Sequence, residues 1–161
     1  NVTIVGDIKH SRVARSNIAA FTMLGAQVTL VAPPTLLPTH IAQWPVRVSH
    51  SLDEVIASTD VLYMLRLQSE RMDQGLIPNL GEYGNRFGLT DQRAQKLQST
   101  AVVMHPGPMN RGVEMHVDPA DLPNSLIHKQ VANGVSVRMA VLFDVLARGG
   151  ELNSLKEEGV A

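Results

Sequence analysis

Short apolar runs alternate with stretches of helical periodicity along this chain. Five runs have the length and character of strands, and they span residues 2–5, 27–32, 46–49, 60–65 and 101–105. The run DVLYML at 60–65 is apolar at successive positions, which is typical of a strand buried on both faces. Strands that alternate with helices predict an α/β fold: a three-layer, doubly wound parallel sheet of the Rossmann-like kind.

The helical stretches have recognisable ends. SRVARSNIAAFTMLG predicts a helix that stops at Gly25 and whose inner face is traced by Ile18, Phe21, Thr22 and Leu24. Ser51 is predicted to cap a short helix that runs to residue 57, and Thr90 a second one that runs to residue 97.

Two further segments differ from this pattern. Residues 68–89 are polar and are interrupted by Pro78 and by several glycines, which predicts a loop. Residues 125–148 predict a long final helix that is apolar over much of its surface.

Composition narrows the function classes. The 161 residues, with a net charge of −1, are enough for one domain and carry no concentration of basic residues suited to a broad nucleic-acid surface. The absence of cysteine excludes disulfides, thiolate metal sites and cysteine nucleophiles. We see no signal peptide and no apolar run near the ~20 residues that span a bilayer, so we expect a cytoplasmic protein. Because the sequence starts at a strand without Met, we expect it to be part of something longer.

Candidate chemistry gathers in three loops. Ligands of doubly wound sheets bind at the carboxyl ends of the strands, and the loops after the first, fourth and fifth strands contain GDIKHSR, RLQSER and HPGPMNR. The first loop lacks the Gly-x-Gly-x-x-Gly pattern of a dinucleotide site. Each loop carries arginine and none places a nucleophile beside a base, which favours a site that binds anions.

Two arginines are the strongest candidates for that site. Arg12 stands at a helix start, where the positive end of the helix dipole is unfavourable for a cation. A bound anion that contacts both the arginine and the helix start would make this position favourable. Arg66 directly follows the buried fourth strand, Gln68 can face the same way, and Glu70 could hold the guanidinium in place if a helix begins there. The alternatives are a solvated arginine at position 12 and a surface ion pair at position 66.

The loop HPGP has different chemistry. Pro106 and Pro108 donate no backbone hydrogen bond, so the loop is stiff and rich in free carbonyl groups, which suit a ligand that brings N–H donors, such as an amide or carbamoyl group. Gly107 permits close approach of such a ligand. A rigid turn without a ligand is the alternative. His105 and His116 are too isolated to indicate a metal site.

The three loops, in this order and at this spacing, resemble the aspartate carbamoyltransferase family. The matching stretches are VGDIKHSRVARSN, LVAPPTLLP, DVLYMLRLQSERM, VVMHPGPMNRGVEM and QVANGVSVRMAVL. The resemblance is to the second, aspartate-binding domain of that family's catalytic chain. It implies transfer of the carbamoyl group of carbamoyl phosphate to L-aspartate, a step of pyrimidine synthesis. It places L-aspartate on Arg12, Arg66 and Gln68, and carbamoyl phosphate on the segment from Pro106 through Gly107 to Pro108.

The resemblance carries further expectations. It implies no cofactor, no metal and no covalent intermediate, with the departing phosphate taking the proton of the amine. The family's Ser-Thr-Arg-Thr phosphate motif belongs to a first domain that is absent here, and the helix at 125–148 would pack on that domain. We therefore expect the chain to be inactive alone and the full chain to form a homotrimer, with regulatory or dihydroorotase partners possible. Because the 68–89 loop is polar, interrupted by glycines and adjacent to Arg66, we also expect it to be mobile and to close over aspartate.

Three alternatives remain at this stage. An ornithine carbamoyltransferase shares fold and donor but typically has a cysteine in the loop that corresponds to HPGP. A non-catalytic assembly module of the same fold would keep the domain without the reaction. A nucleotide-binding Rossmann domain conflicts with the missing glycine loop.

Overall fold

The computed structural model describes residues 1–67, 75–77 and 79–158, the last eleven of these by their backbone alone. The chain divides into two compact units, Asn1–Ile127 and His128–Ala161. The first unit contains the sheet and the three loops that carry the candidate chemistry. The second is the greater part of one helix.

The first unit is built on a five-stranded sheet in which every neighbouring pair is parallel. The strands are β1 (Val2–Val5), β2 (Val28–Val31), β3 (Arg47–Ser49), β4 (Val61–Met64) and β5 (Val102–Met104). Their order across the sheet is β3-β2-β1-β4-β5. This arrangement confirms the predicted doubly wound parallel sheet, with each strand inside its predicted run.

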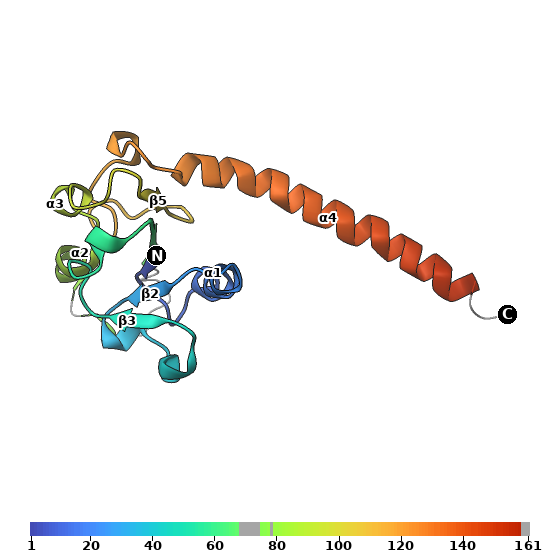
Figure 1. Cartoon of the computed structure of the whole chain (residues 1–161), viewed down its shortest axis with the longest axis horizontal. Helices are drawn as coiled ribbons and strands as arrows, with labels where there is room; N and C mark the ends of the chain where they lie inside the picture. The colour runs from blue at the N-terminus through green and yellow to red at the C-terminus, as the bar shows by residue number, and fades with distance from the viewer. Residues whose placement is uncertain (68–74, 78, 159–161) are drawn as a thin grey trace. The chain divides into compact units, whose positions relative to one another are not determined.

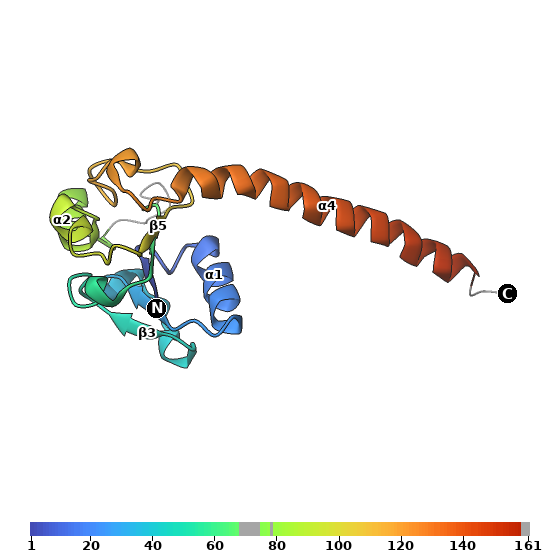
Figure 2. The same ribbon diagram turned by 45° about the horizontal axis from the view of Figure 1, so that its top comes forward.

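Helices cover both faces of the sheet. Helix α1 (Arg12–Met23) lies on one side, and α2 (Leu80–Phe87) and α3 (Asp91–Ala94) lie on the other (Figures 1 and 2). The chain runs outward from β1 through β2 to β3 and then returns to place β4 on the other side of β1. Ligands of doubly wound sheets bind where the order reverses in this way, at the carboxyl ends of the strands. In this chain the reversal falls between β1 and β4.

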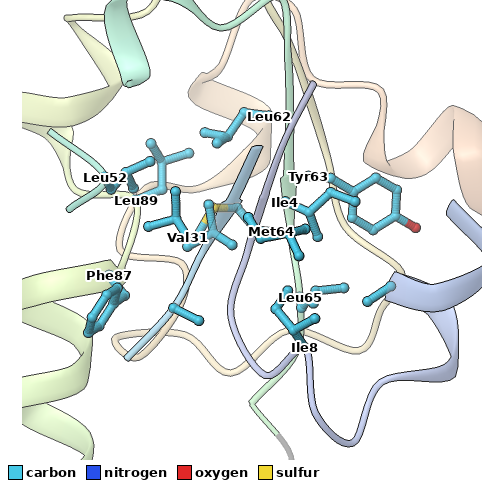
Figure 3. Packing of buried hydrophobic residues seen from close by; sticks show 14 of the residues in the cluster. Ile4, Ile8, Val31, Leu52, Leu62, Tyr63, Met64, Leu65, Phe87 and Leu89 are labelled. Carbon is cyan, nitrogen blue, oxygen red and sulfur yellow. The ribbon is translucent and has the colours of Figure 1, made fainter. Parts of the chain in front are cut away.

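The core is aliphatic and lies on both faces of the strands. Ile4 is paired in register with Tyr63, and both are buried on the side that α1 covers. Val31 is buried on the opposite side, with Phe87 and Leu89 beyond it (Figure 3). Burial on both faces explains why the strands read as continuous apolar runs instead of alternating ones.

The predicted helix ends are largely confirmed. Ser11 caps α1 by accepting a hydrogen bond from the amide of Ala14 at 3.1 Å, and Gly25 follows the helix with φ +81°. Thr90 caps α3 in the same way, but α3 ends at Ala94 and does not continue to residue 97 as predicted. The inner face of α1 was predicted wrongly at one position, since Leu24 is 83% exposed. Leu24 lies past the last helical residue, and Ala14 is buried on the inner face instead.

Two local predictions were wrong. Ser51 caps no α-helix, because the segment forms only a short 3-10 turn, η3 (Ile56–Ser58), and the Ser51 amide donates to the hydroxyl of Ser49. A segment of this length is too short to repay the cost of nucleating an α-helix. The loop predicted over residues 68–89 contains helix α2, whose first turn Asn79 caps by accepting from the Glu82 amide at 2.7 Å. Residues 68–74 and 78 are not among those described.

Helix α4 (Ile127–Glu158) supplies the described part of the second unit. The periodicity of residues 125–148 predicted this helix, but α4 continues past the predicted end at residue 148. Its stretch Ile127–Ala147 is long and apolar enough to cross a membrane by length and composition, which the sequence reading did not anticipate. This is weak evidence for a membrane span, because core helices of water-soluble proteins meet the same two criteria. Large apolar side chains are exposed along it, namely Val131, Val135, Val137, Met139, Val141, Leu142, Phe143, Val145 and Leu146.

An ion-pair cluster joins the two connections that lead into β4 and β5. Asp53 accepts from Arg93 at 2.8 Å and from Lys96 at 2.8 Å, and Arg93 also donates to the carbonyl of Gly88 at 2.7 Å. The hydrogen bond from Arg93, followed by that from Lys96, lowers the pKa of Asp53 to about 2 from an ordinary value of 3.8. The carboxylate is 43% exposed, so solvent screens much of this interaction.

We expect Asp53→Asn to lower the free energy of unfolding at neutral pH by about 1 kcal/mol. A depressed carboxyl pKa stabilises the folded state above the unfolded-state pKa, and this contribution is lost as the pH falls from about 4 to about 2. Urea titrations of both proteins should therefore show a difference at pH 7 that narrows across that window. A difference that stays constant from pH 7 to pH 2 would contradict the assignment.

Candidate functional site

The three loops with candidate chemistry meet around one small cavity of about 90 Å³. The loop after β1 contributes Asp7, the start of α1 contributes Ser11 and Val13, the end of β4 contributes Leu65 and Arg66, and the loop after β5 contributes Pro106 and Gly107. Parallel strands place their carboxyl ends at one edge of the sheet, which is why segments far apart in sequence gather here. A space of this size suits a carboxylate or carbamoyl group, since pockets for larger ligands typically exceed ~300 Å³.

The structure brings some of the predicted site residues together at this cavity. Arg66 is half-buried and lines it, as do Pro106 and Gly107. Gly107 has φ +65°, and a Cβ there would meet nothing within 4 Å, so the backbone of the turn is open on that side. The common location is consistent with the expected roles of these residues but does not test them.

Other predicted residues lie differently. Arg12 is the first residue of α1, and its exposed side chain is not part of the lining, although both of its neighbours are. Pro108 is exposed and also stands outside the lining. Gln68 and Glu70 belong to the part of the chain that the structure leaves undescribed. The roles expected for Arg12, Pro108 and Gln68 therefore remain predictions.

The loop after β1 is braced from within. Asp7 is buried, one of its oxygens accepts from the His10 amide at 3.1 Å, and both oxygens lie 3.0 Å from Nδ1 of the same histidine. The carboxylate is thereby committed to its own loop. Ser11 then caps α1, whose first turn contains no acidic side chain. The positive end of the α1 dipole and the Arg66 guanidinium thus both border the cavity, an arrangement that favours an anion.

The loop after β5 rests on a buried histidine. The Gly107 amide donates to Nδ1 of His105 at 2.9 Å, and Nε2 of His105 lies 3.2 Å from Oε1 of Glu114. An amide can only donate, so Nδ1 is the acceptor and the neutral ring carries its hydrogen on Nε2, which donates to the carboxylate. His105 and Glu114 are both fully buried.

The same carboxylate also links two of the loops. Oε1 of Glu114 accepts from the Asn110 amide at 2.6 Å, and the Asn110 side chain donates to the carbonyl of Leu67 at 2.8 Å. Leu67 directly follows Arg66, so the loop after β5 is attached to the backbone that presents the arginine. Sequence reasoning missed this network. The available signal was Glu114 itself, an acidic residue between the apolar Val113 and Met115.

Tyr83, from α2, is a further buried polar residue, and its hydroxyl is influenced by Glu114 and Asp7. Burial raises the pKa of the Tyr83 hydroxyl, and the negative charges of Glu114 and Asp7 raise it further. The phenol therefore stays neutral at physiological pH.

Within the described residues, no group of three or more metal-ligating side chains is placed to hold a metal ion.

A larger hollow of about 410 Å³ lies elsewhere, at the ion-pair cluster. Both cations of its lining, Arg93 and Lys96, already bond to Asp53, and the remaining charged side chain of the lining is Asp91. It also involves neither the loop after β1 nor the loop after β4. The cavity at the carboxyl ends of the strands is therefore the better candidate site.

Comparison with known proteins identifies the family. The family model for the Asp/Orn binding domain of aspartate/ornithine carbamoyltransferase matches residues 1–145. The chain belongs to this family.

Similar proteins place the chain within the carbamoyltransferases. It is 52% identical over 158 residues to the aspartate carbamoyltransferase catalytic subunit of Thermobifida fusca, and this match covers 98% of this chain and 50% of that protein. It is 54% identical over 160 residues to the corresponding Mycobacterium ulcerans subunit, covering 99% and 49%. The chain thus spans about half the length of the curated relatives it matches.

Solved structures agree with the sequence comparison. The catalytic subunit of M. jannaschii aspartate transcarbamoylase matches with a TM-score of 0.72 at 27% identity, over 91% of this chain and 50% of that one. The Trypanosoma cruzi aspartate transcarbamoylase in complex with aspartate and phosphate matches with a TM-score of 0.71 at 26% identity, over 89% and 49%. A carbamoyltransferase second domain, as expected from the sequence, is therefore the fold of this chain.

Proposed function

We propose that this chain is the aspartate-binding half of an aspartate carbamoyltransferase catalytic chain. The reaction forms N-carbamoyl-L-aspartate and phosphate from carbamoyl phosphate and L-aspartate, a step of pyrimidine biosynthesis. One observation carries the proposal: Arg66 and the Pro106–Gly107 turn border the same small cavity at the switch point of the sheet. Relatives named aspartate carbamoyltransferase at above 50% identity support the choice of aspartate.

In this proposal, positive groups hold the two carboxylates of aspartate. Arg66 borders the cavity and can bind a carboxylate through two parallel hydrogen bonds, with Gln68 assisting it. Arg12 binds the second carboxylate from the first turn of α1, where the helix dipole adds to the attraction.

The donor binds at the turn after β5. The carbonyls of Pro106, Gly107 and Pro108 accept hydrogen bonds from the NH₂ of the carbamoyl group. The amino nitrogen of aspartate attacks the carbamoyl carbon, a C–N bond forms, the C–O bond to phosphate breaks, and the departing phosphate takes the proton from nitrogen. The protein accelerates this step by orientation and charge stabilisation.

We propose that the complete enzyme contains more than this chain, since the chain spans about half the length of its relatives. We propose that a first domain binds the phosphate of the donor and that the apolar surface of the helix at 125–148 packs on that domain. We also propose a cytoplasmic homotrimer, with regulatory or dihydroorotase subunits as further partners, and no cofactor.

The test is an assay of the full-length catalytic chain beside the present chain alone. We expect the full-length protein to form carbamoyl-aspartate, with kcat/KM for aspartate on the order of a hundredfold or more above that for ornithine. The present chain alone should show no turnover. Preference for ornithine would indicate the other branch of the family. Absence of turnover with either amino acid, despite a folded trimer, would indicate an assembly module.

A further inference from the structure

Four hydrogen bonds form a continuous chain beneath the two substrate loops. It begins at the Leu67 carbonyl, beside Arg66, and passes through Asn110 to Oε1 of Glu114. It continues from that oxygen to Nε2 of His105 and ends where Nδ1 of the ring accepts from the Gly107 amide. One carboxylate oxygen therefore makes two connections. Through His105 it supports the Pro106–Pro108 turn, and through Asn110 it ties this turn to the loop that carries Arg66.

Burial strengthens these four hydrogen bonds. Glu114 and His105 have no exposed surface, so neither group can exchange its partner for water. The contact from the Asn110 amide to the carboxylate is short, at 2.6 Å, as hydrogen bonds to carboxylates are. Removing Glu114 would take the carboxylate away from the fully buried Nε2–H of His105 and from the partly buried amide of Asn110, and losing the acceptor of a buried donor is costly in a low-dielectric interior.

The bond to His105 has a chemical consequence for the donor turn. Pro106 and Pro108 have no amide hydrogen, and the single amide hydrogen of the turn, on Gly107, is directed at Nδ1 of His105. Every remaining polar backbone group from Pro106 to Pro108 is a carbonyl. The turn can thus only accept hydrogen bonds from a ligand, provided that Nδ1 stays free of hydrogen.

We propose that Glu114 is a positioning residue that holds His105 in its Nε2–H tautomer and thereby keeps the donor turn an acceptor-only surface that selects an NH₂-bearing donor. The inference rests on the proposed function for its substrate, while its structural part stands without it. Glu114 is not among the residues that line the cavity, and it acts through His105. Without the carboxylate, the ring can place its hydrogen on Nδ1, which would repel the Gly107 amide and turn it toward the ligand.

The first experiment measures the tautomer directly. In the full-length chain, long-range ¹H–¹⁵N correlation spectra of the histidine rings should show His105 with an unprotonated Nδ1 and a protonated Nε2. Glu114→Ala should give a mixture of tautomers or the Nδ1–H form. Glu114→Gln should keep the native form, because its amide oxygen can accept from the same two donors. A protonated Nδ1 in the unmodified protein would overturn the proposal whatever the enzyme catalyses.

The second experiment separates positioning from general stability. Glu114→Ala should raise the KM for carbamoyl phosphate about tenfold while the KM for aspartate changes much less, and Glu114→Gln should recover most of the loss. The matched control is Leu52→Ala, a fully buried core position far along the chain from the loops, which lowers stability without a selective change in either KM. If the KM values for carbamoyl phosphate and for aspartate changed equally in Glu114→Ala, as in Leu52→Ala, Glu114 would have only a structural role. If Glu114→Ala does not fold, the spectrum of the unmodified protein and the Glu114→Gln kinetics decide, and a selective rise in KM for Glu114→Gln would also overturn the proposal.

Discussion

Replacing Arg66 by alanine is expected to weaken aspartate binding on the order of a hundredfold in the full-length enzyme. Arg66 is half-buried and lines the cavity at the end of β4, where a bound carboxylate would be partly desolvated. Truncating one partner of such a charge pair typically costs 2–5 kcal/mol, and each ~1.4 kcal/mol corresponds to a factor of ten. The KM for aspartate and the affinity for a bisubstrate analogue are the quantities to measure, with the melting temperature as a check on folding.

Two further variants make this test specific. Arg66→Lys keeps the charge but loses the planar fork that matches a carboxylate, so we expect it to recover only a small part of the affinity. Arg86→Ala is the matched control, because Arg86 is an exposed arginine of α2 that contacts only Glu82 at 3.8 Å among the ion pairs of the described chain. If Arg66→Ala kept aspartate affinity within threefold of the unmodified enzyme, the assignment of Arg66 to the substrate would be wrong.

Replacing Gly88 by alanine is expected to produce the largest loss of stability of any single methyl addition considered for this chain, about 3 kcal/mol. A Cβ at this position would lie 2.5 Å from the carbonyl oxygen of Gly84 and 2.6 Å from that of Val113. Both obstacles are backbone atoms that cannot rotate away. The Gly88 carbonyl is itself held by Arg93, so the residue cannot retreat. A fall in melting temperature of roughly 10 °C, measured by calorimetry, is the expected readout.

Gly81, in the first turn of α2, provides the control. A Cβ on Gly81 would meet only the end of the Asn79 side chain, at 3.3 Å, and alanine is the better helix former. Gly81→Ala should therefore change the stability little. Because Val113 precedes Glu114, Gly88→Ala should also raise the KM for carbamoyl phosphate through displacement of the segment that carries the carboxylate. A melting temperature for Gly88→Ala equal to that of Gly81→Ala would show that α2 does not pack as described.

Several features of the site could be anticipated before the fold was known. The order of apolar runs predicted which three loops meet, because parallel strands bring their carboxyl ends to one edge. Arg66 and the Pro106–Gly107 turn were placed there for that reason, and the cavity confirms their common location. Arg12 was placed at the helix start correctly, but its side-chain direction could not be predicted from periodicity alone.

The glycines of residues 68–89 show where sequence reasoning failed. Gly84 and Gly88 were taken as interruptions of regular structure, yet they lie within and directly after α2, and they let its backbone approach the segment around Val113. A missing side chain signals flexibility and close packing equally well. Only the position of the neighbouring segment distinguishes the two.

By itself, the sequence determined the strands, the stop of α1 at Gly25, the Thr90 cap of α3 and the chemistry of the three loops, because these depend on neighbours a few positions apart. Only the tertiary structure decided which buried groups are partners. The Asn110 side chain donates a hydrogen bond to the carbonyl of Leu67, 43 residues away, and Nε2 of His105 donates to the carboxylate of Glu114 across the turn. Such pairings are set by distances in the folded interior, where a donor must find an acceptor because water is excluded. A linear pattern of residue types does not contain those distances.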